Sequence, residues 1–575
     1  MGSTCPRLPH TSTYRAMPAP TTPLSATRRP FLRALPPSAF LLFLGLATPC
    51  ASQGIEEGGP SQLQGLRTPA EASDFARHTG HDEMMAYLTR VQAEASDMRL
   101  GSYGRTLEGR DLPVAFFSRP HVTSPAEAHA TGKPVVVLGA NAHGHNYVAR
   151  EALLILLREL GAPGSEMNEL LDRVIVLVAP SKNPDGLAAE DRFNARGADL
   201  NRDYMTLDQP SMAAYVGNVI NRWNPHLFVD GHDGGAVQYG GAFPYHLLYQ
   251  GPGLAGADPA LGDLADHRVL PHVNQALASE GFQSFYWSRG DAERWLVGGA
   301  APRMGRNYGG LANKLSILFE VAEWPGMEAG VEVALHAYRS ILTYTRDHGD
   351  ELMGTVQAAR ERTVALGREP TGQVPVAERM EADSLRVTYQ IVDPAQVDPS
   401  LPVQEEALLT VEDAPILRQA VGTRFRDRPW AYLLPPSAEA AVALLKRHRI
   451  EVERLAAPVE VEVRGYTLEG IRWESADNHH GAAPVIQVGE EVDYRVHLPP
   501  GTWVVRTGQV LGRVVTHLLE PETTDNIFYW DRMTFLLPLA ELEAFHMSPE
   551  TVEPPLLPIR KLMAPARLPT MLDGG

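Results

Sequence analysis

The sequence predicts an α/β fold: a mixed, mainly parallel sheet with helices on both faces, followed by a smaller α+β or β-rich carboxyl-terminal region. Short apolar runs rich in β-branched residues begin near residues 135, 174, 226 and 315, and each has the length and composition of a buried strand. Stretches with apolar residues at helical spacing lie between these runs. Strands that alternate with helices along a chain favour a sheet covered on both faces.

The first strand-to-helix turn of this pattern carries two histidines. Val135 to Leu138 form a buried strand, and Gly139 to Asn141 break the apolar run. His143 and His145 follow the break, before a helix that begins near Val148. In open α/β sheets ligands bind beyond the carboxyl ends of the strands, so these histidines occupy a position suited to chemistry.

Two further strands are expected to end in polar residues. The run 226–229 is followed by Asp230 and His232, and the run 315–319 is followed by Glu320. The carboxyl ends of parallel strands meet at one edge of a sheet. We therefore expect the polar residues of all three strand ends to lie near one another.

The remaining expected elements flank this centre. Apolar residues at helical spacing predict a helix over 81–95, and a glycine-containing turn joins two strands within 100–117. Beyond residue 365 the stretch 367–377 is rich in Pro, Gly and Glu, which is typical of a linker. Further strands are expected at 428–435, 459–463, 492–496 and 503–506, with a helix over 438–448.

Composition and charge exclude some classes of partner. The chain has 575 residues, of which 44% are hydrophobic and 21% charged, as in a soluble globular protein of at least two domains. Its formal net charge is −18. A nucleic acid or an anionic membrane surface requires a basic face, so neither is expected as a partner.

The first fifty residues resemble an export signal. Arg28 and Arg29 precede an apolar run at 39–47, and small residues follow at 50–52. This order is typical of a signal peptide, and the paired arginines resemble the bacterial twin-arginine type. The alternative is a short membrane anchor, but the run is too short to span a bilayer comfortably, so no stable membrane span is expected after processing. We predict an exported protein, periplasmic or extracellular.

The cysteine positions limit the chemistry of the processed protein. The two cysteines, Cys5 and Cys50, lie in or beside the predicted signal. Once it is removed no thiol remains, which excludes a disulfide, a cysteine nucleophile and a thiolate metal site. Any metal must then be held by His, Asp, Glu or Asn side chains.

Four groups of residues, separate in the sequence, together resemble the M14 family of zinc carboxypeptidases. They are Gly104–Arg110, His143 with its i+3 neighbour, the run Asn183–Asp203, and Asp230–His232 followed by Tyr308–Asn313 and Glu320. The run Asn183–Asp203 is the most specific of these motifs. The resemblance covers residues 75 to 350 and keeps the order of the family.

This resemblance implies a hydrolytic site with one zinc ion. His143, Asn146 and His232 stand at the metal-ligand positions, and Glu320 at the position of the general base. A hydrolytic zinc has three protein ligands and one open position, where the pKa of bound water falls to about 7. Glu320 would take the proton of the attacking water and pass it to the leaving amine.

The resemblance also implies substrate-binding residues. Arg192 matches the arginine that stabilises the tetrahedral oxyanion, and Asn201 and Arg202 match the pair that holds a substrate's terminal carboxylate. A guanidinium suits both tasks because its planar fork donates two parallel hydrogen bonds. The implied function is an exported zinc-dependent metallocarboxypeptidase that hydrolyses a C-terminal peptide bond or a related amide bond.

One ligand position departs from the family pattern. The family motif is H-x-x-E, but the residue three positions after His143 is Asn146. A neutral amide oxygen is a poorer zinc ligand than a carboxylate, and His145, Asp230 or Asp233 are conceivable replacements. The alternative function is therefore a metal-deficient pseudopeptidase that binds peptides or serves as a scaffold. Retention of Glu320 and the arginines favours the enzyme.

These observations divide the chain into five expected segments. They are a twin-arginine signal peptide over 1–52, a linker over 53–75, an M14-like peptidase domain over 76–365, a linker over 366–385 and a carboxyl-terminal accessory region over 386–575.

Overall fold

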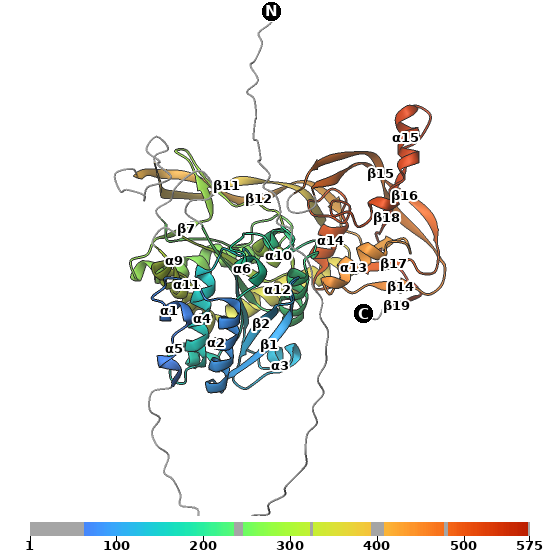
Figure 1. Ribbon diagram of the computed structural model, residues 1–575. Helices are drawn as coiled ribbons and strands as arrows, with labels where there is room; N and C mark the ends of the chain where they lie inside the picture. Colours follow the sequence, from blue (N-terminus) through green and yellow to red (C-terminus); the bar gives the residue numbers. More distant parts are fainter. Residues whose placement is uncertain (1–61, 235–244, 323–325, 393–407, 477–480, 573–575) are drawn as a thin grey trace, which may run out of the picture. The chain divides into compact units, whose positions relative to one another are not determined.

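An eight-stranded sheet organises the amino-terminal part of the molecule (Figure 1). The computed structural model describes residues 62–234, 245–322, 326–392, 408–476 and 481–572. The strand order is β1-β2-β4-β3-β5-β10-β6-β7. The strands are β1 (Met98–Arg105), β2 (Asp111–Phe117), β3 (Val135–Ala140), β4 (Ile175–Ala179), β5 (Leu227–Asp233), β6 (Leu247–Gln250), β7 (Ser284–Tyr286) and β10 (Leu315–Val321).

The pairing confirms a mixed, mainly parallel sheet. Four of the seven strand pairings are parallel: β4 with β3, β3 with β5, β5 with β10, and β6 with β7. The central strands β3, β4, β5 and β10 are buried along their whole length. Continuous apolar runs form strands of this kind because helices cover both faces of the sheet.

The two faces of β3 belong to two different cores. Val136 and Leu138 pack in a core with residues of α2 (His81–Glu94), α4 (Val148–Gly161), α9 (Leu270–Ser279), α11 (Met327–Asp347) and α12 (Gly349–Arg368). Val135 and Val137, with side chains on the opposite face, pack in a second core with Tyr215 and Tyr308. The alternation of side chains along a strand thus divides one apolar run between two layers.

Several short helices connect these layers. They are α1 (Pro69–Ala72), α3 (Pro125–Ala130), α5 (Glu166–Glu169), α6 (Pro184–Ala188), α7 (Pro210–Ala214), α8 (Pro259–Leu264) and α10 (Gly305–Leu311). Five of the seven begin with proline, which suits the first helical turn because its ring fixes φ and the missing N–H would be unpaired there. Turns of π-helix follow α7 at Tyr215–Asn221 and α8 at Ala265–Val269.

A long hairpin lies where the sequence predicts a linker. α12 continues to Arg368, and β11 (Gln373–Val392) then pairs antiparallel with β12 (Leu408–Asp427). The short strands β9 (Trp295–Val297) and β8 (Ser288–Gly290) complete this four-stranded sheet. Proline, glycine and glutamate suggested an irregular segment, but the buried Val374 and Val376 alternate with the more exposed Gln373 and Pro375 and place one face of β11 against the protein.

The carboxyl-terminal region is β-rich, as predicted. Its seven-stranded sheet has the order β16-β15-β18-β13-β17-β14-β19, and all its strand pairings are antiparallel. The strands are β13 (Ala431–Leu434), β14 (Glu453–Leu455), β15 (Val459–Ser475), β16 (Ala482–Leu498), β17 (Trp503–Arg506), β18 (Leu556–Leu562) and β19 (Thr570–Leu572). Its helices are α13 (Glu439–Arg447), α14 (Gly512–Leu519) and α15 (Leu539–Met547).

The carboxyl-terminal region shares a core with the peptidase-like region. Tyr432, Leu445 and Leu518 are fully buried in the same core as Val135 and Tyr308. His448 hydrogen-bonds to the hydroxyl of Tyr308 at 2.9 Å. The two parts therefore pack as one body between residues 59 and 575. The predicted segment boundaries remain predictions, and the predicted signal peptide lies outside the described residues.

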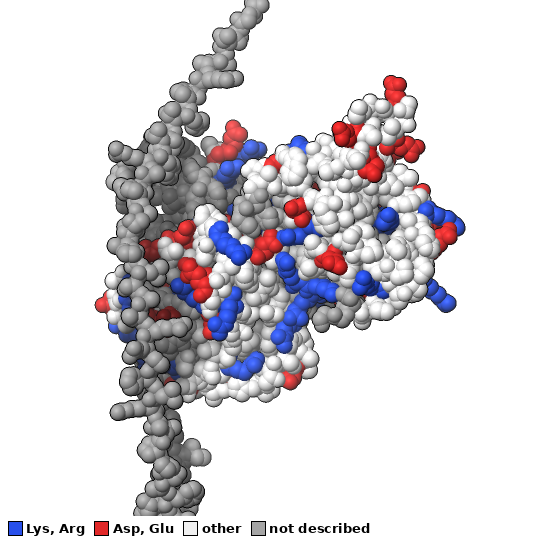
Figure 2. Space-filling model, turned by 45° about the vertical axis from the view of Figure 1, so that its right-hand side comes forward, with Lys and Arg blue, Asp and Glu red and all other residues white. Residues whose placement is uncertain are grey.

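The face in Figure 2 carries both basic and acidic side chains. None of the helices in the described ranges has the length and apolar character needed to cross a membrane.

Candidate active site

Three neighbouring strands bring the predicted residues to one edge of the sheet. β5 lies between β3 and β10, and Gly139 pairs with Asp230 in the parallel register. Glu320 pairs directly with His232, because β5 continues through the polar residues 230–233 and β10 through Glu320. The close approach expected from the strand ends is present in the structure.

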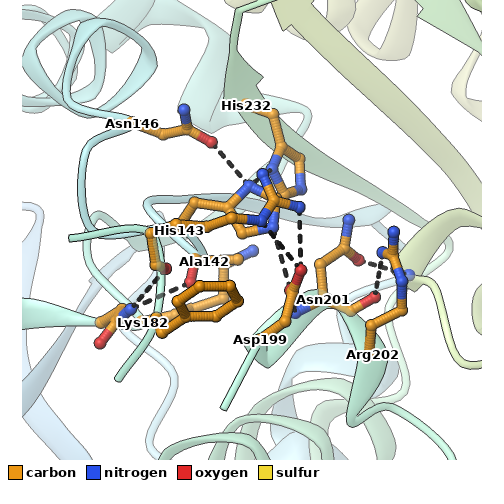
Figure 3. A network of polar contacts seen from close by, with 12 residues as sticks. Ala142, His143, Asn146, Lys182, Asp199, Asn201, Arg202 and His232 are labelled. Carbon is orange, nitrogen blue, oxygen red and sulfur yellow. Dashed lines mark hydrogen bonds and ion pairs between the residues drawn. The ribbon is translucent and has the colours of Figure 1, made fainter. Parts of the chain in front are cut away.

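The side chains of His143, His232 and Asn146 point toward one another (Figure 3). The Nδ1 atoms of the two histidines are 3.3 Å apart. The Oδ1 atom of Asn146 lies 3.0 Å from Nδ1 of His143. All three side chains are buried, so three polar atoms share a small volume closed to bulk water.

A carboxylate lies behind each of the two histidines. Nε2 of His143 donates to Oδ1 of Asp199 at 3.0 Å. Nε2 of His232 lies 3.3 Å from Oδ2 of Asp230. The hydrogen bond from Nε2 of His143 to Asp199 leaves a lone pair on Nδ1 of His143, which faces Nδ1 of His232. Histidine ligands of metals commonly make this second contact to a carboxylate.

Burial keeps His143 neutral. Desolvation lowers its pKa to about 4, although Asp199 acts in the opposite direction. A neutral imidazole is the form that binds a metal, since the lone pair of the facing nitrogen is then available. The two Nδ1 atoms, 3.3 Å apart with an amide oxygen beside them, are arranged as donors to a shared cation.

The three donors fit a metal ion, with an amide in the third position. Two nitrogens at about 2.0–2.1 Å from a tetrahedral zinc lie about 3.3–3.4 Å apart, which matches the separation of the two Nδ1 atoms, 3.3 Å. Among the described residues no three His, Cys, Asp or Glu side chains form a group that could hold a metal. The set that fits is therefore His143, His232 and the Asn146 amide.

The amide of Asn146 is held with its oxygen toward the histidines. Its Nδ2 donates to the backbone carbonyl of Asp233 at 3.1 Å, which orients Oδ1 toward His143. The turn is closed by Asn141, whose φ is +58° and whose Nδ2 donates to the carbonyls of His143 and Asn146 at 2.9 Å. The geometry of the third ligand is thus determined before any metal binds.

The alternative third ligands are engaged elsewhere. The carboxylate of Asp233 accepts from the amides of Val148 and Ala149 at 2.6 and 2.9 Å and caps α4. Asp230 is paired with Lys182 and accepts from the Tyr204 hydroxyl at 3.1 Å. The ring of His145 is parallel to that of His143, with 6.1 Å between centroids. None of these groups converges on the two Nδ1 atoms.

Glu320 has the environment of an acid–base group. It is buried, and desolvation raises the pKa of its carboxyl well above the ordinary value, with further contributions from Asp233 and Asp230. Arg192 acts against this increase. A carboxyl with a raised pKa exchanges protons nearer neutral pH than an exposed one does.

Arg192 binds the same carboxylate as His143. Its Nε and Nη2 atoms donate to Oδ2 of Asp199 at 3.1 and 2.8 Å. Nη1 of Arg192 makes no hydrogen bond within the described part of the chain, and the side chain is partly exposed. One edge of the guanidinium is therefore anchored and the other is available to an oxyanion.

Asn201 and Arg202 lie on a short 3₁₀ turn next to this group. The backbone amide of Asn201 donates to Oδ1 of Asp199 at 2.8 Å, so Asp199 also caps the turn. Oδ1 of Asn201 accepts from the backbone amide of Gly305 at 3.2 Å. The first turn of α10 therefore lies next to Asn201 and Arg202, the predicted carboxylate-binding pair.

Asp199 has a central role that the sequence did not indicate. In the sequence it stands only inside the run Asn183–Asp203. In the structure it joins His143, Arg192 and Asn201, and its pKa is well below the ordinary value, since His143 and the arginines outweigh the effect of burial. No local sequence signal predicts contacts with His143, 56 residues away.

Tyr308 points away from the site. It is fully buried, and its hydroxyl contacts Nδ1 of His448 at 2.9 Å and Nδ2 of Asn221 at 2.6 Å. The nearest tyrosine before Glu320 in the sequence therefore joins the two regions of the chain and does not face the metal-ligand positions.

The carboxyl-terminal region contacts the segment before α10, which lies next to Asn201. The carbonyl of Arg303 accepts from the amide of Tyr204, and its buried guanidinium pairs with Asp525 at 2.9 Å. The guanidinium also lies over the ring of Tyr529, 5.1 Å from its centroid. Residues far along the chain thus hold the segment that leads into α10.

The family comparison agrees with this arrangement. Residues 84–280 match the family model described as zinc carboxypeptidase, peptidase M14. The match contains His143, Asn146, Arg192 and His232, and Glu320 follows it.

Proteins named carboxypeptidase are similar to this chain, some of them over most of its length. Carboxypeptidase 2 of Trichophyton rubrum is 24% identical over 466 residues, which cover 78% of this chain and 83% of the relative. Probable carboxypeptidase 2 of Arthroderma benhamiae is 24% identical, with 83% and 90% covered. Carboxypeptidase E of Caenorhabditis elegans is 32% identical over 158 residues, covering 24% of this chain and 32% of that protein.

Solved structures of carboxypeptidases are also similar. A metallo-carboxypeptidase from Burkholderia cenocepacia has a TM-score of 0.37 and 21% identity, covering 46% of this chain and 69% of that one. Carboxypeptidase A from Helicoverpa armigera has a TM-score of 0.38 and 17% identity, covering 50% and 75%.

Proposed function

We propose that this chain, which belongs to the M14 family of zinc carboxypeptidases, is an exported zinc-dependent metallocarboxypeptidase that removes the C-terminal residue of a peptide or hydrolyses a related amide bond. Membership of the family makes it a metallocarboxypeptidase and hence a hydrolase. The observation that carries the zinc proposal is the convergence of His143, His232 and Asn146, with a carboxylate behind each histidine.

The metal would be held by the Nδ1 atoms of His143 and His232 and by the amide oxygen of Asn146. A zinc ion bound there would act as a Lewis acid and lower the pKa of a coordinated water to about 7. Because Asn146 is neutral, it offsets less of the ion's charge than a carboxylate. We expect weaker zinc binding than at a site with a glutamate, and a more acidic bound water.

In this proposal Glu320 moves the proton. It is adjacent to His232 in the parallel register, and its raised pKa suits it to accept a proton from the attacking water and donate it to the leaving amine. Burial supports this role because a dry site strengthens the electrostatic interactions of the reacting groups.

The arginines and Asn201 orient the substrate. The unpaired Nη1 of Arg192 can donate to the oxyanion that develops on the scissile carbonyl, while Asp199 prevents the guanidinium from rotating away. Arg202, with Asn201, can hold the terminal carboxylate through charge-assisted hydrogen bonds. This pair would select the last residue of a peptide over internal positions.

Export is supported by the amino-terminal segment and the cysteine positions. The paired arginines, short apolar run and small residues precede the first described residue. We infer a periplasmic or extracellular location, and an amino-terminal sequence of the secreted protein beginning near residue 53 would support it. A mature protein that retains residues 1–52 would contradict it.

Asn146 also favours a second candidate function. If the neutral amide leaves zinc binding too weak, the candidate active site would still have its arginines. It would then bind peptides without cleaving them. This is the metal-deficient pseudopeptidase considered from the sequence.

Metal analysis of the purified protein separates the two functions. Wild type, Asn146→Glu and His232→Ala would be dialysed against buffer with trace zinc and measured by elemental analysis. Near-stoichiometric zinc in wild type, lost in His232→Ala, is the expected result. An empty wild type together with zinc in Asn146→Glu would contradict a working zinc enzyme and favour the peptide-binding protein.

A further inference from the structure

A pocket of about 680 Å³ lies at the end of the sheet opposite the candidate active site. α12 forms one wall, and Asn224, in the turn before β5, and Val510, from the carboxyl-terminal region, lie across from it. His129 of α3 completes the lining. The pocket therefore joins three parts of the chain at the amino ends of β5 and β10.

Arg360 of α12 is the main charged group of the pocket. Its side chain is buried, with 5% of the residue exposed. Nη2 donates to the carbonyls of Asn224 and Pro225 at 3.1 and 2.8 Å, and Nε donates to the carbonyl of Asn313 at 3.4 Å. Arg360 lines the pocket, and its Nη1 atom has no hydrogen-bond partner among the described residues.

No carboxylate compensates this cation within the described structure. Arg360 forms no ion pair with a described residue, and burial alone lowers its pKa to about 10. The two acidic residues of the lining, Glu361 and Glu369, are exposed, and Glu361 accepts from Nε2 of Gln357 at 2.8 Å. A buried charge without a counter-charge is unfavourable, so an anion beside Arg360 would stabilise this arrangement.

Two neighbouring groups are also buried close to Arg360. Lys314 is fully buried and donates to the carbonyl of Ala312 at 2.9 Å, and burial and Arg360 lower its pKa. His226 is 7% exposed, and its Nδ1 accepts from the amide of Val135 at 3.0 Å. The proton of neutral His226 is then on Nε2, which has no partner in the described residues.

We propose that this pocket binds a small organic anion whose carboxylate or phosphate group pairs with Nη1 of Arg360 and whose apolar part contacts Val364, Ala365 and Val510. A guanidinium binds either kind of group through its planar fork of donors. The ligand would contact both the peptidase-like and the carboxyl-terminal regions. This site is separate from the proposed catalytic function.

Calorimetric titration of the full chain tests the proposal. The probes are inorganic phosphate and butyrate, which distinguish a phosphate ligand from a carboxylate with an apolar chain. We expect at least one probe to bind, and Arg360→Gln to weaken that binding by about 10-fold or more. Arg495→Gln, which changes an exposed arginine of β16, and Arg202→Gln, in the candidate active site, should leave the affinity within about twofold.

Two charge changes in the pocket lining, at Gln357 and Glu361, test the proposal even if Arg360→Gln does not fold. These are the rim variants. Gln357→Glu is isosteric and adds a negative charge one turn before Arg360, so it should weaken binding about 2–4-fold. Glu361→Gln removes a negative charge from the lining and should strengthen binding by a similar factor. Failure of both probes to bind, or equal affinity in wild type and both rim variants, would overturn the proposal.

Discussion

Asp199 holds His143 through one carboxylate oxygen and Arg192 through the other. Oδ1 accepts from Nε2 of His143 at 3.0 Å, and Oδ2 accepts from Nη2 of Arg192 at 2.8 Å. A single carboxylate therefore orients a candidate metal ligand and the candidate oxyanion-stabilising group together. Figure 3 shows His143 and Asp199 in this contact.

Asp199→Asn should weaken zinc binding and catalysis at the same time. The amide cannot accept two charge-assisted hydrogen bonds, and loss of such an outer contact typically lowers metal affinity about 10–100-fold. Competition with a fluorescent zinc chelator measures the affinity, and steady-state kinetics on a C-terminal dipeptide substrate measure kcat/KM. Asp191→Asn, on the exposed loop before Arg192, is the matched control. Unchanged zinc affinity in Asp199→Asn would contradict the positioning role.

Glu320→Gln should lower kcat while zinc remains bound. The amide cannot accept a proton from the attacking water, and loss of general acid–base catalysis typically costs about 10²–10⁴ in rate. His143 and His232 are unchanged, so elemental analysis should find the zinc content of wild type. A kcat within a factor of about two of wild type would exclude Glu320 as the base.

The same residue predicts a pH dependence of stability in the metal-free protein. The pKa of Glu320 in the fold is raised from its ordinary value of 4.5, so the folded state binds the proton more tightly than the unfolded state. Its contribution to the free energy of unfolding is therefore greatest below pH 4.5 and decreases as the pH rises toward the folded pKa. Glu320→Gln should remove this decrease.

Urea unfolding of the two metal-free proteins across a range of pH checks this expectation. The stability of Glu320→Gln relative to wild type should increase with pH above 4.5 and then level off. A constant difference over the whole range would mean that the carboxyl is not perturbed by its surroundings.

Asp525→Asn should destabilise the fold and raise KM. Asp525 is fully buried against the nearly buried Arg303, and removal of one partner leaves an uncompensated charge, which typically costs about 3–5 kcal/mol. Asn tolerates the backbone at this position, where φ is +62°, so the effect is electrostatic. Urea unfolding and peptide kinetics measure the two changes.

The control for this prediction is Asp531→Asn, an exposed residue with a similar backbone, φ +56°. It should unfold like wild type. Equal stability of the Asp525 and Asp531 variants would show that the carboxyl-terminal region does not support the segment before α10, near Asn201.

Much of the fold follows from local patterns in the chain. Periodicity predicted the helix found as α2, and apolar runs predicted the strands found as β3, β4, β5 and β10. These patterns predict the elements because side chains return to the same face with one period in a helix and with a different period in a strand. The same reasoning predicted a linker at 367–377, where β11 begins, since proline and glycine content does not record the pairing of β11 with β12.

The sequence by itself determined the order of strands and helices and the chemical types of the candidate site, including an amide at position 146. Only the tertiary structure decided that Asn146 turns its oxygen toward the histidines, that Asp199 serves both His143 and Arg192, and that Tyr308 faces the carboxyl-terminal region. Periodicity and motifs record which residues are near one another along the chain. Contacts between distant residues depend on how buried polar groups find partners when the layers pack, and that is a property of the whole fold.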